Sequence, residues 1–417
     1  METLPRVADA PPATTLRCRR GRTERDRLEW RISDGGDPAG LIEEFLAGHG
    51  LPVADLTRPA DAEHHDTDGG VCGAALFVSA AAGNLLAGAG AGPPSPTVGV
   101  PDLVAVVYAH APAAPSPPTP AGAGWWPAPD APARWWLGPW RPSWTPAGHA
   151  AAVRSARAAI GRGDVYQVNV VGHASAPYAG DPRPALARLA GLPGARYGGL
   201  LTGDGWAIGC ASPETLVEVV GGRALTRPIK GTRPATAAGR RDLLASAKER
   251  AEHIMIVDLE RNDLARIART GSVRVDELYA VRRWCDLWQA ESTVSAVLAD
   301  GTGLADLLRA VCPGGSVTGA PKLAAVARIA ALEPVGRGIS MGALGWVGPD
   351  RVDLGLTIRT AVADTDRMHL WAGGGITWGS EPDAEVDEAA AKAAPLRRAL
   401  AGVPAASSGN ERIAFQP

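Results

Sequence analysis

The chain has 417 residues, which is enough to bury either one large core or two subdomains. Apolar residues make up 46% of it and the formal net charge is −2, so the composition is that of an ordinary globular protein, and we expect no nucleic-acid partner. No apolar run is long enough to cross a bilayer, and the five widely spaced cysteines fit no zinc pattern, so we expect a cytoplasmic protein that contacts no membrane.

The first third of the chain predicts strands followed by a linker. We expect loose tails at 1–24 and, at the other end of the chain, at 403–417. Apolar and β-branched residues at 74–78 and 104–108 are typical of buried strands. Pro, Ala and Gly dominate 111–132, which indicates a linker or a long surface loop.

The rest of the chain mixes helices and strands. The spacing of apolar residues predicts a helix over 145–160 and another over 320–332, after a glycine-rich segment. Strands are expected at 270–275 and at 351–362, the second because its apolar and polar side chains alternate. Strands that dominate, with helices between them, indicate an α+β fold.

Lysine is rare here, because only four of the 42 basic residues that are Lys or Arg are lysines. Arg stays protonated and cannot be a nucleophile, whereas a buried Lys can. The few lysines should therefore be enriched at positions where Arg fails. Lys230 is the strongest candidate, since Pro228 and Gly231 flank it and favour a tight loop that a ligand can approach.

Two Glu-x-x-Glu steps predict paired carboxylates on helices. Glu249 and Glu252 should share one helix face, and Glu385 and Glu388 repeat the spacing near the C-terminus. If the two steps face each other, they form an all-oxygen site that suits Mg²⁺. The alternative is an exposed acidic face, with Glu388 paired to Lys392 four residues later.

Further segments could bind anions or move protons. Backbone N–H groups at 373–375 and 313–322 could bind an anion, although Ala320 stands where a nucleotide-binding loop needs Lys, or else both are ordinary turns. Arg359 could pair with a ligand carboxylate or lie exposed at a strand edge. Glu214, sixteen residues before Lys230, could be an acid/base partner of that amine or an ordinary surface residue.

Taken together, these segments resemble the chorismate-utilising enzymes, the family of anthranilate synthase component I, aminodeoxychorismate synthase component I, isochorismate synthase and salicylate synthase. The resemblance is strong from about residue 161 to 401 and poor before about residue 145. Many matched segments in one order are more specific than any single motif. They are 163–169, 212–214, 227–232, 248–253, 255–259, 261–264, 313–322, 357–360 and 372–376.

The resemblance implies a fold and a domain organisation. The fold is α+β, with antiparallel β-sheets sandwiched by helices in two intertwined subdomains. A chorismate-binding catalytic domain is expected at 146–402. It would follow a poorly matched N-terminal region at 1–145, which holds strands and the Pro/Ala-rich linker, and precede a flexible tail at 403–417.

The resemblance also implies a mechanism. The P-I-K-G-T sequence around Lys230 resembles the aminodeoxychorismate synthases, whereas anthranilate synthases typically carry Ala at that position. Lys230 would attack C2 of Mg²⁺-bound chorismate as the 4-hydroxyl leaves, with Glu214 as general acid. Ammonia would then add at C4 and expel the lysine, giving 4-amino-4-deoxychorismate.

Metal and substrate contacts follow from the same resemblance. Glu252 and Glu388 match the direct Mg²⁺ ligands, and Glu249 and Glu385 match the supporting water shell. Arg359, Gly373 and Gly375 match groups that hold the substrate carboxylates. The full set of expected substrate contacts is Gly231, Thr232, Gln289, Thr318, Trp346, Arg359, Gly373, Gly375 and Lys392.

Two positions depart from the family pattern. Gln289 stands where the family commonly has His, and Gln can orient a hydroxyl by hydrogen bonding but cannot carry protons. Trp346 replaces a usual Tyr near the substrate. Both departures concern the positioning of the ring, not the nucleophile or the metal.

No glutamine-hydrolysing triad is recognisable, because none of the cysteines lies in a nucleophile-elbow context. We therefore expect ammonia to come from a glutamine amidotransferase subunit, component II. The implied activity is that of a transferase in para-aminobenzoate and folate biosynthesis, or in a secondary-metabolite pathway. The alternatives are anthranilate or 2-amino-2-deoxyisochorismate formation, against which Lys230 argues, and a chorismate-binding protein without turnover.

Overall fold

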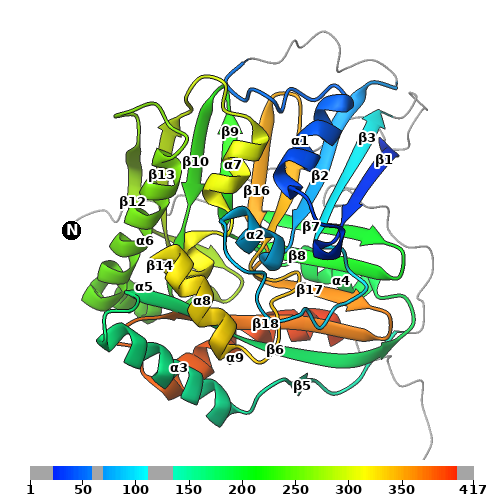
Figure 1. The fold of residues 1–417 in the computed structure, drawn as a ribbon. Coiled ribbons are helices and arrows are strands. Elements are labelled where there is room, and N and C mark those ends of the chain that lie inside the picture. The colour runs from blue at the N-terminus through cyan, green and yellow to red at the C-terminus, as the bar shows by residue number, and fades with distance from the viewer. Residues whose placement is uncertain (1–21, 59–68, 111–134, 402–417) are drawn as a thin grey trace, which may run out of the picture.

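A computed structural model describes residues 22–58, 69–110 and 135–401, which form two β-sheets and the helices that cover them (Figure 1). The linker expected over 111–132, the tail at 403–417 and nearly all of the tail at 1–24 lie outside the described residues. No helix in the described ranges is long and apolar enough to span a membrane.

The larger sheet has ten antiparallel strands drawn from both halves of the chain. Its order is β1 (Arg22–Trp30), β3 (Leu103–His110), β2 (Val71–Val78), β15 (Ala343–Val347), β16 (Arg351–Leu356), β9 (Thr215–Val220), β10 (Arg223–Arg227), β13 (Leu287–Val297) and β11 (Ile229–Pro234), and β12 (Arg274–Trp284) pairs with β13. Because β2 pairs with β15, the N-terminal strands share a sheet with strands that come more than 260 residues later.

The smaller sheet has eight antiparallel strands. Its order is β14 (Gly319–Ala320), β6 (Gln167–Ala179), β18 (Arg367–Ile376), β17 (Thr360–Asp364), β8 (Trp206–Ser212) and β7 (Tyr197–Gly203), while β4 (Trp136–Leu137) and β5 (Arg141–Pro142) pair with β6. The long strands β6 and β18 pair without a register shift, so Asn169 stands opposite Gly375. These two paired strands form one wall of a cavity in the protein.

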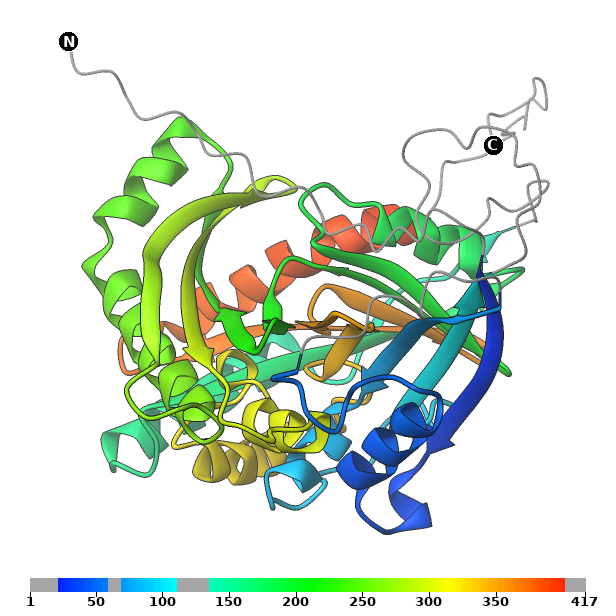
Figure 2. The ribbon, with the colours of Figure 1, turned by 90° about the horizontal axis from the view of Figure 1, so that it is seen from above.

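Helices cover both sheets, and side chains cap the starts of some of them. At the start of one helix, the Ser246 side chain accepts a hydrogen bond from the Glu249 N–H. At the start of another, the Thr145 side chain accepts a hydrogen bond from the Gly148 N–H. The elements are α1 (Pro38–Gly48), α2 (Ala80–Leu86), α3 (Pro146–Gly161), α4 (Arg183–Ala190), α5 (Ala237–Ala245), α6 (Ala247–Ala265), α7 (Leu304–Val311), α8 (Lys322–Leu332) and α9 (Pro382–Ala401), with the 3₁₀ turns η1 (Ile32–Asp34) and η3 (Gly315–Val317). Both α4 and α9 run along the smaller sheet (Figure 2).

The largest apolar core lies between the two sheets. Leu76 and Val217 enter it from the larger sheet, and Ile208 enters it from the smaller one. A second core, which includes Leu186 and Leu396, fills the space between the smaller sheet and the helices α4 and α9. Two sheets that share one core and are covered by helices confirm the expected α+β fold.

Several expected elements are confirmed and two are wrong. The strands at 74–78 and 104–108 fall within β2 and β3, and the two expected helices correspond to α3 and α8. The strand expected at 270–275 is mostly a turn, because β12 begins only at Arg274. The strand expected at 351–362 is broken, since β16 ends at Leu356 and belongs to the larger sheet while β17 belongs to the smaller.

The break in this strand is a crossover between the sheets. Arg359 adopts a φ of 53°, a left-handed conformation that no regular strand contains. A second crossover joins β8 to β9 through Pro213 and Glu214. The two crossovers are hydrogen-bonded to each other, from the Leu356 N–H to the Glu214 carbonyl at 3.1 Å and from the Ala211 N–H to the Arg359 carbonyl at 3.1 Å.

Candidate active site

A cavity lies beside these two crossovers. Its walls come from β11 of the larger sheet, from β6 and β18 of the smaller sheet, from the helices α6 and α9, and from the turn η3. Segments more than 200 residues apart in the sequence thus meet around one space. Glu214 and Arg359, the two polar crossover residues, both line it.

Lys230 enters the cavity from β11. The register of β11 against β13 shifts between Lys230 and Thr232, and Gly231 occupies the shift with a φ of 73°. The Lys230 Nζ donates a hydrogen bond to the Ser316 carbonyl at 3.0 Å. Burial lowers the pKa of Lys230, although the negative charge of Glu214 opposes this, so the neutral amine forms at a lower pH than in an ordinary lysine.

Glu214 lies at the crossover between β8 and β9 and is 3% exposed. Its Oε1 accepts a hydrogen bond from the Ile229 N–H at 3.1 Å, so the carboxyl is tied to the residue that precedes Lys230. Burial raises the pKa of Glu214, while hydrogen bonding from Ser316 and the charge of Lys230 oppose the rise. A carboxyl with a raised pKa next to an amine with a lowered pKa is an acid/base pair suited to proton transfer.

The turn η3 connects these two groups, and its role was missed in the sequence. Ser316 contacts Lys230 through its carbonyl and Glu214 through its hydroxyl. Arg337 links the turn to β6. Its guanidinium donates to the Val317 carbonyl of the turn at 2.6 Å and to the Asn169 carbonyl of β6 at 3.1 Å. The glycine pattern at 313–322 indicated a turn, but it could not predict that Arg337 would hydrogen-bond to it.

The two Glu-x-x-Glu steps meet in the cavity. Glu249 and Glu252 reach it from α6, and Glu385 and Glu388 reach it from α9. Burial and then the charge of Glu388 raise the pKa of Glu385. Burial also raises the pKa of Glu252, and a hydrogen bond of 2.5 Å from the Thr377 hydroxyl partly offsets this rise.

Basic side chains balance part of this negative charge. Lys392 lies 2.7 Å from Glu388 and holds its pKa below the usual range against the effect of burial. Arg233 lies 3.0 Å from Glu249. Among the described residues, Glu252 has only a longer ion pair, 3.8 Å from the Lys248 amine.

These carboxylates could hold a Mg²⁺ ion only together with oxygen atoms from a ligand or from water. No three His, Cys, Asp or Glu side chains of the described ranges are close enough to form a complete metal site by themselves. Mg²⁺ usually keeps several waters and is held by one or two carboxylates together with substrate oxygens. Glu252 and Glu388, one from each helix, supply carboxylates of the right type for that arrangement.

Arg359 is a cation that lines the cavity from the crossover between β16 and β17. It is 7% exposed, and its guanidinium stacks over Trp284 at 4.7 Å from the ring centroid. Burial lowers its pKa to about 10, and its Nε has no hydrogen-bond partner among the described residues. An anionic ligand would satisfy this group. Of the two alternatives for Arg359, exposure at a strand edge is therefore wrong. The residue is buried and lines a pocket, where it can pair with an anion.

Glycines on β18 keep the cavity open. A Cβ atom on Gly375 would lie 2.7 Å from Nε2 of Gln167 and 2.9 Å from Nζ of Lys230. At Gly374 it would approach the carboxylate of Glu385 and the amine of Lys392, both at 3.3 Å. The glycine run at 373–375 is therefore needed for space as well as for any peptide contacts to an anion.

The remaining expected contacts divide into two groups. Gly231, Thr232 and Gln289 line the cavity. The expected contact of Trp346 is corrected, because this residue lies in β15, is buried against Tyr108 with ring centroids 5.9 Å apart, and does not line the cavity. Thr318 does not line it either, since its hydroxyl donates to the Gly314 carbonyl at 2.8 Å and stabilises the turn η3.

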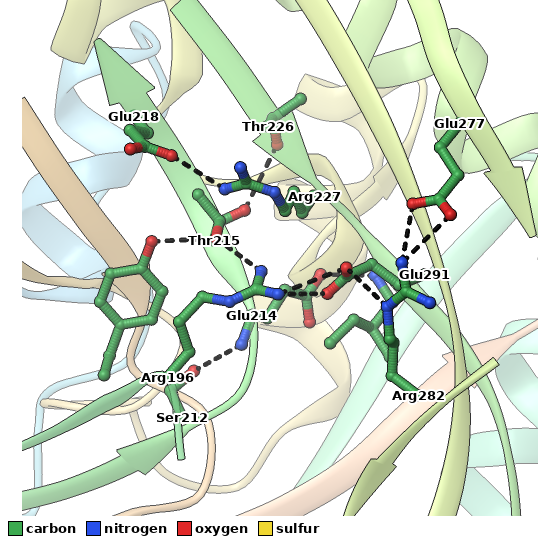
Figure 3. A network of polar contacts seen from close by, with 12 residues as sticks. Arg196, Ser212, Glu214, Thr215, Glu218, Thr226, Arg227, Glu277, Arg282 and Glu291 are labelled. Carbon is green, nitrogen blue, oxygen red and sulfur yellow. Dashed lines mark hydrogen bonds and ion pairs between the residues drawn. The ribbon is translucent and has the colours of Figure 1, made fainter. Parts of the chain in front are cut away.

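A polar network next to Glu214 was also missed (Figure 3). The buried Glu291 on β13 pairs with Arg196 at 3.1 Å and more weakly with Arg282 at 3.8 Å. Arg196 donates to the Thr215 hydroxyl at 3.0 Å, so the network fixes the residue that follows Glu214. The sequence offered no signal for it, because its members are far apart along the chain.

Gln167 and Asn169 on β6 are two further residues that the sequence analysis did not single out. Both side chains are buried, at 0% and 5% exposure. Both amide atoms of Gln167 and the Oδ1 of Asn169 lack a hydrogen-bond partner among the described residues. Buried polar atoms without a partner are rare in folded proteins and point to a ligand.

Comparisons with known proteins agree with this geometry. Residues 123–398 match the family described as chorismate binding enzyme. Aminodeoxychorismate synthase component 1 from Bacillus subtilis (strain 168) is 37% identical over 260 residues, which are 61% of this chain and 55% of that protein. Anthranilate synthase component 1 from Streptomyces coelicolor is 38% identical over 276 residues, which are 64% and 54%. The chain thus spans about half the length of these relatives.

A solved structure supports the fold over nearly the whole chain. Anthranilate synthase component I from Streptococcus pneumoniae TIGR4 superposes with a TM-score of 0.71 and 27% sequence identity, covering 93% of both chains. This likeness confirms the expected fold, including the N-terminal strands for which the sequence resemblance was poor.

The lowered pKa of Lys230 predicts selective chemical labelling. A small acylating reagent reacts only with the neutral amine, so Lys230 should be modified at a lower pH than a lysine in an unstructured peptide. Peptide mass spectrometry across a pH series measures this, with Lys230→Met as the control that removes the signal. Modification of Lys230 only at the pH of the free peptide would contradict the burial argument.

Proposed function

This chain is a member of the chorismate binding enzyme family, and on that premise we propose that it aminates chorismate at C4, as an aminodeoxychorismate synthase component I does. Relatives with that name and relatives named anthranilate synthase match at nearly the same identity, so their names do not decide between the two activities. The observation that carries the proposal is the Lys230 amine in a cavity that Glu214 and the paired carboxylates also line.

A nucleophilic lysine changes the position at which ammonia adds. Direct addition of ammonia at C2 would lead to anthranilate or 2-amino-2-deoxyisochorismate. If Lys230 occupies C2 first, the remaining electrophilic carbon is C4, from which the hydroxyl has left. Lys230 therefore favours the 4-amino product over these alternatives.

The proposed first half-reaction forms the lysine adduct. The neutral Lys230 amine forms a bond to C2, the two ring double bonds shift, and the C4–O bond breaks. Glu214 gives its proton to the departing hydroxyl, which leaves as water, and the Glu214 carboxylate then takes one proton back from the new secondary ammonium at Nζ. The raised pKa of Glu214 and the lowered pKa of Lys230 supply the acid and the free base that this step needs.

The second half-reaction releases the lysine. Ammonia forms a bond to C4, the double bonds shift back, and the C2–Nζ bond breaks with its electron pair going to Lys230. The surplus proton on the C4 nitrogen passes to the departing Lys230 nitrogen, so that Lys230 leaves as a neutral amine and not as an amide anion. The chain is thereby returned to its starting state with one hydroxyl of chorismate exchanged for an amine.

Other residues of the cavity would bind and orient the substrate. The Arg359 guanidinium and the peptide groups of Gly373 and Gly375, which line the cavity, would hold the substrate carboxylates. Gln289 could hydrogen-bond a ring substituent, and Lys392 holds Glu388 in place. Glu252 and Glu388 would be the Mg²⁺ ligands, with Glu249 and Glu385 holding waters around the ion.

When bound, Mg²⁺ would neutralise a substrate carboxylate and fix its position between the two helices. We further propose that a glutamine amidotransferase subunit, component II, supplies ammonia in the cell. The remaining alternative is a chorismate-binding protein without turnover. It is disfavoured because the acid and the amine have pKa shifts of the directions that catalysis requires.

The proposed function predicts a product. Purified protein with chorismate, Mg²⁺ and an ammonium salt at alkaline pH should form 4-amino-4-deoxychorismate, because a larger fraction of the ammonium is then present as ammonia. Chromatography with mass detection separates it from anthranilate. Glutamine alone should give no product. Anthranilate as the main product, turnover with glutamine by the pure chain, or chorismate binding without turnover would each contradict the proposal.

The metal assignment predicts a binding defect that is measurable without turnover. Titration calorimetry in the presence of chorismate should show Mg²⁺ binding that is weakened roughly 10-fold or more in Glu252→Gln and Glu388→Gln, since each removes a charged ligand. The exposed Asp387→Asn, on the same helix as Glu388, is the matched control and should bind Mg²⁺ as the wild type does. Unchanged Mg²⁺ affinity in both Glu variants would exclude this site.

A further inference from the structure

Asn169 presents a buried acceptor to the cavity. The residue lines the cavity, is 5% exposed, and its Oδ1 has no hydrogen-bond partner among the described residues. Burial of a carbonyl oxygen without a partner costs free energy, so such a group is retained in a folded protein only when something else compensates for that cost. A ligand that donates a hydrogen bond is the direct form of compensation.

The backbone of Asn169 is held on both sides. Its N–H donates to the Thr318 carbonyl at 2.7 Å, and its carbonyl accepts from Arg337 at 3.1 Å. Across the strand pair it stands opposite Gly375, which has no side chain to meet it. The orientation of the Asn169 side chain toward the cavity therefore results from β6 itself, not from a flexible loop.

The surroundings of Asn169 favour a small neutral donor. Val317, Met341 and Trp371 line the same cavity and provide apolar surface, which disfavours a hydrated ion. The acidic residues of the cavity come from α6, α9 and the β8–β9 crossover, not from β6. Lys230 already donates to the Ser316 carbonyl, so it has a partner without Asn169.

The type of acceptor matters for an amine nucleophile. A carboxylate would favour the ammonium ion, whose nitrogen has no free electron pair and cannot attack. A neutral carboxamide oxygen can accept one N–H of ammonia without stabilising the extra proton, and it leaves the electron pair available. Asn supplies this acceptor, and its two-residue offset from Gln167 places both side chains on one face of β6.

We infer that the Asn169 Oδ1 binds the ammonia molecule that attacks C4, so that Asn169 is a nucleophile-binding residue of this site. The inference rests on the proposed function, because it takes amination of chorismate as given. It adds a subsite for the second substrate, formed by Asn169 against the apolar wall of the cavity. The donor is an N–H group of ammonia and the acceptor is the Asn169 side-chain oxygen.

Two variants of nearly the same shape test this subsite. Asn169→Leu removes the acceptor, so the KM for ammonium at saturating chorismate should rise roughly 3- to 10-fold, which is the range expected for one lost hydrogen bond. The KM for chorismate should stay within about twofold of the wild type, by the same argument. Because Leu replaces a polar group that has no partner, the melting temperature of the free protein should be equal to or above that of the wild type.

Asn169→Asp keeps an acceptor but adds a negative charge. This variant should bind ammonium at least as tightly as the wild type does, but its kcat near neutral pH should fall because the bound form is protonated. An unchanged ammonium KM in Asn169→Leu would overturn the inference. So would equal increases in the KM for ammonium and for chorismate, a lowered melting temperature, or an Asp variant whose ammonium KM rises as much as that of the Leu variant.

Failure of the proposed function would appear in a different measurement. If the wild type forms anthranilate, the prediction that ammonia adds at C4 is wrong. The ammonium KM of the variants still tests whether Asn169 binds ammonia. If the wild type consumes chorismate without any dependence on ammonium, both the proposed function and the subsite are excluded by the wild type alone.

Discussion

The site depends on two places where the chain crosses between the sheets. The crossover at Glu214 and the crossover at Arg359 are hydrogen-bonded to each other, so neither can move without the other. Each puts a charged side chain at the junction of two rigid sheets instead of on a surface loop. Glu214 and Arg359 are therefore positioned by the same backbone constraint that joins the sheets.

The remaining groups are arranged around this junction. Lys230 reaches it from the edge strand β11, and its amine is held by the turn η3 through Ser316. The buried pair of Arg337 and Glu333, 2.7 Å apart, ties η3 to β6. Such a pair is costly to desolvate, so its value here lies in fixing the geometry of η3 more than in stability. The functional groups thus occupy fixed positions before any substrate binds.

Local patterns in the sequence singled out many of the residues that line the cavity, and long-range pairing decided which of them meet. Lys230 stood out because Arg cannot replace a nucleophile, and the two Glu-x-x-Glu steps stood out through helical spacing. Whether their helices meet could not be read from spacing alone, and the position of Trp346 depended on which strand pairs with β2. Alternation along 351–362 indicated a single strand, because no sequence rule marks the left-handed residue Arg359 at which the chain changes sheets.

The central claim is that the Lys230 amine forms a bond to chorismate. Intact and peptide mass spectrometry after incubation with chorismate and Mg²⁺, without ammonia, tests it most directly. We expect a species heavier by chorismate less one water, located on the peptide that contains Lys230. It should be absent in Lys230→Arg, which should still bind chorismate but lose turnover by a factor on the order of 10⁴ or more. Wild-type turnover in Lys230→Arg, or no adduct in the wild type, would contradict the account.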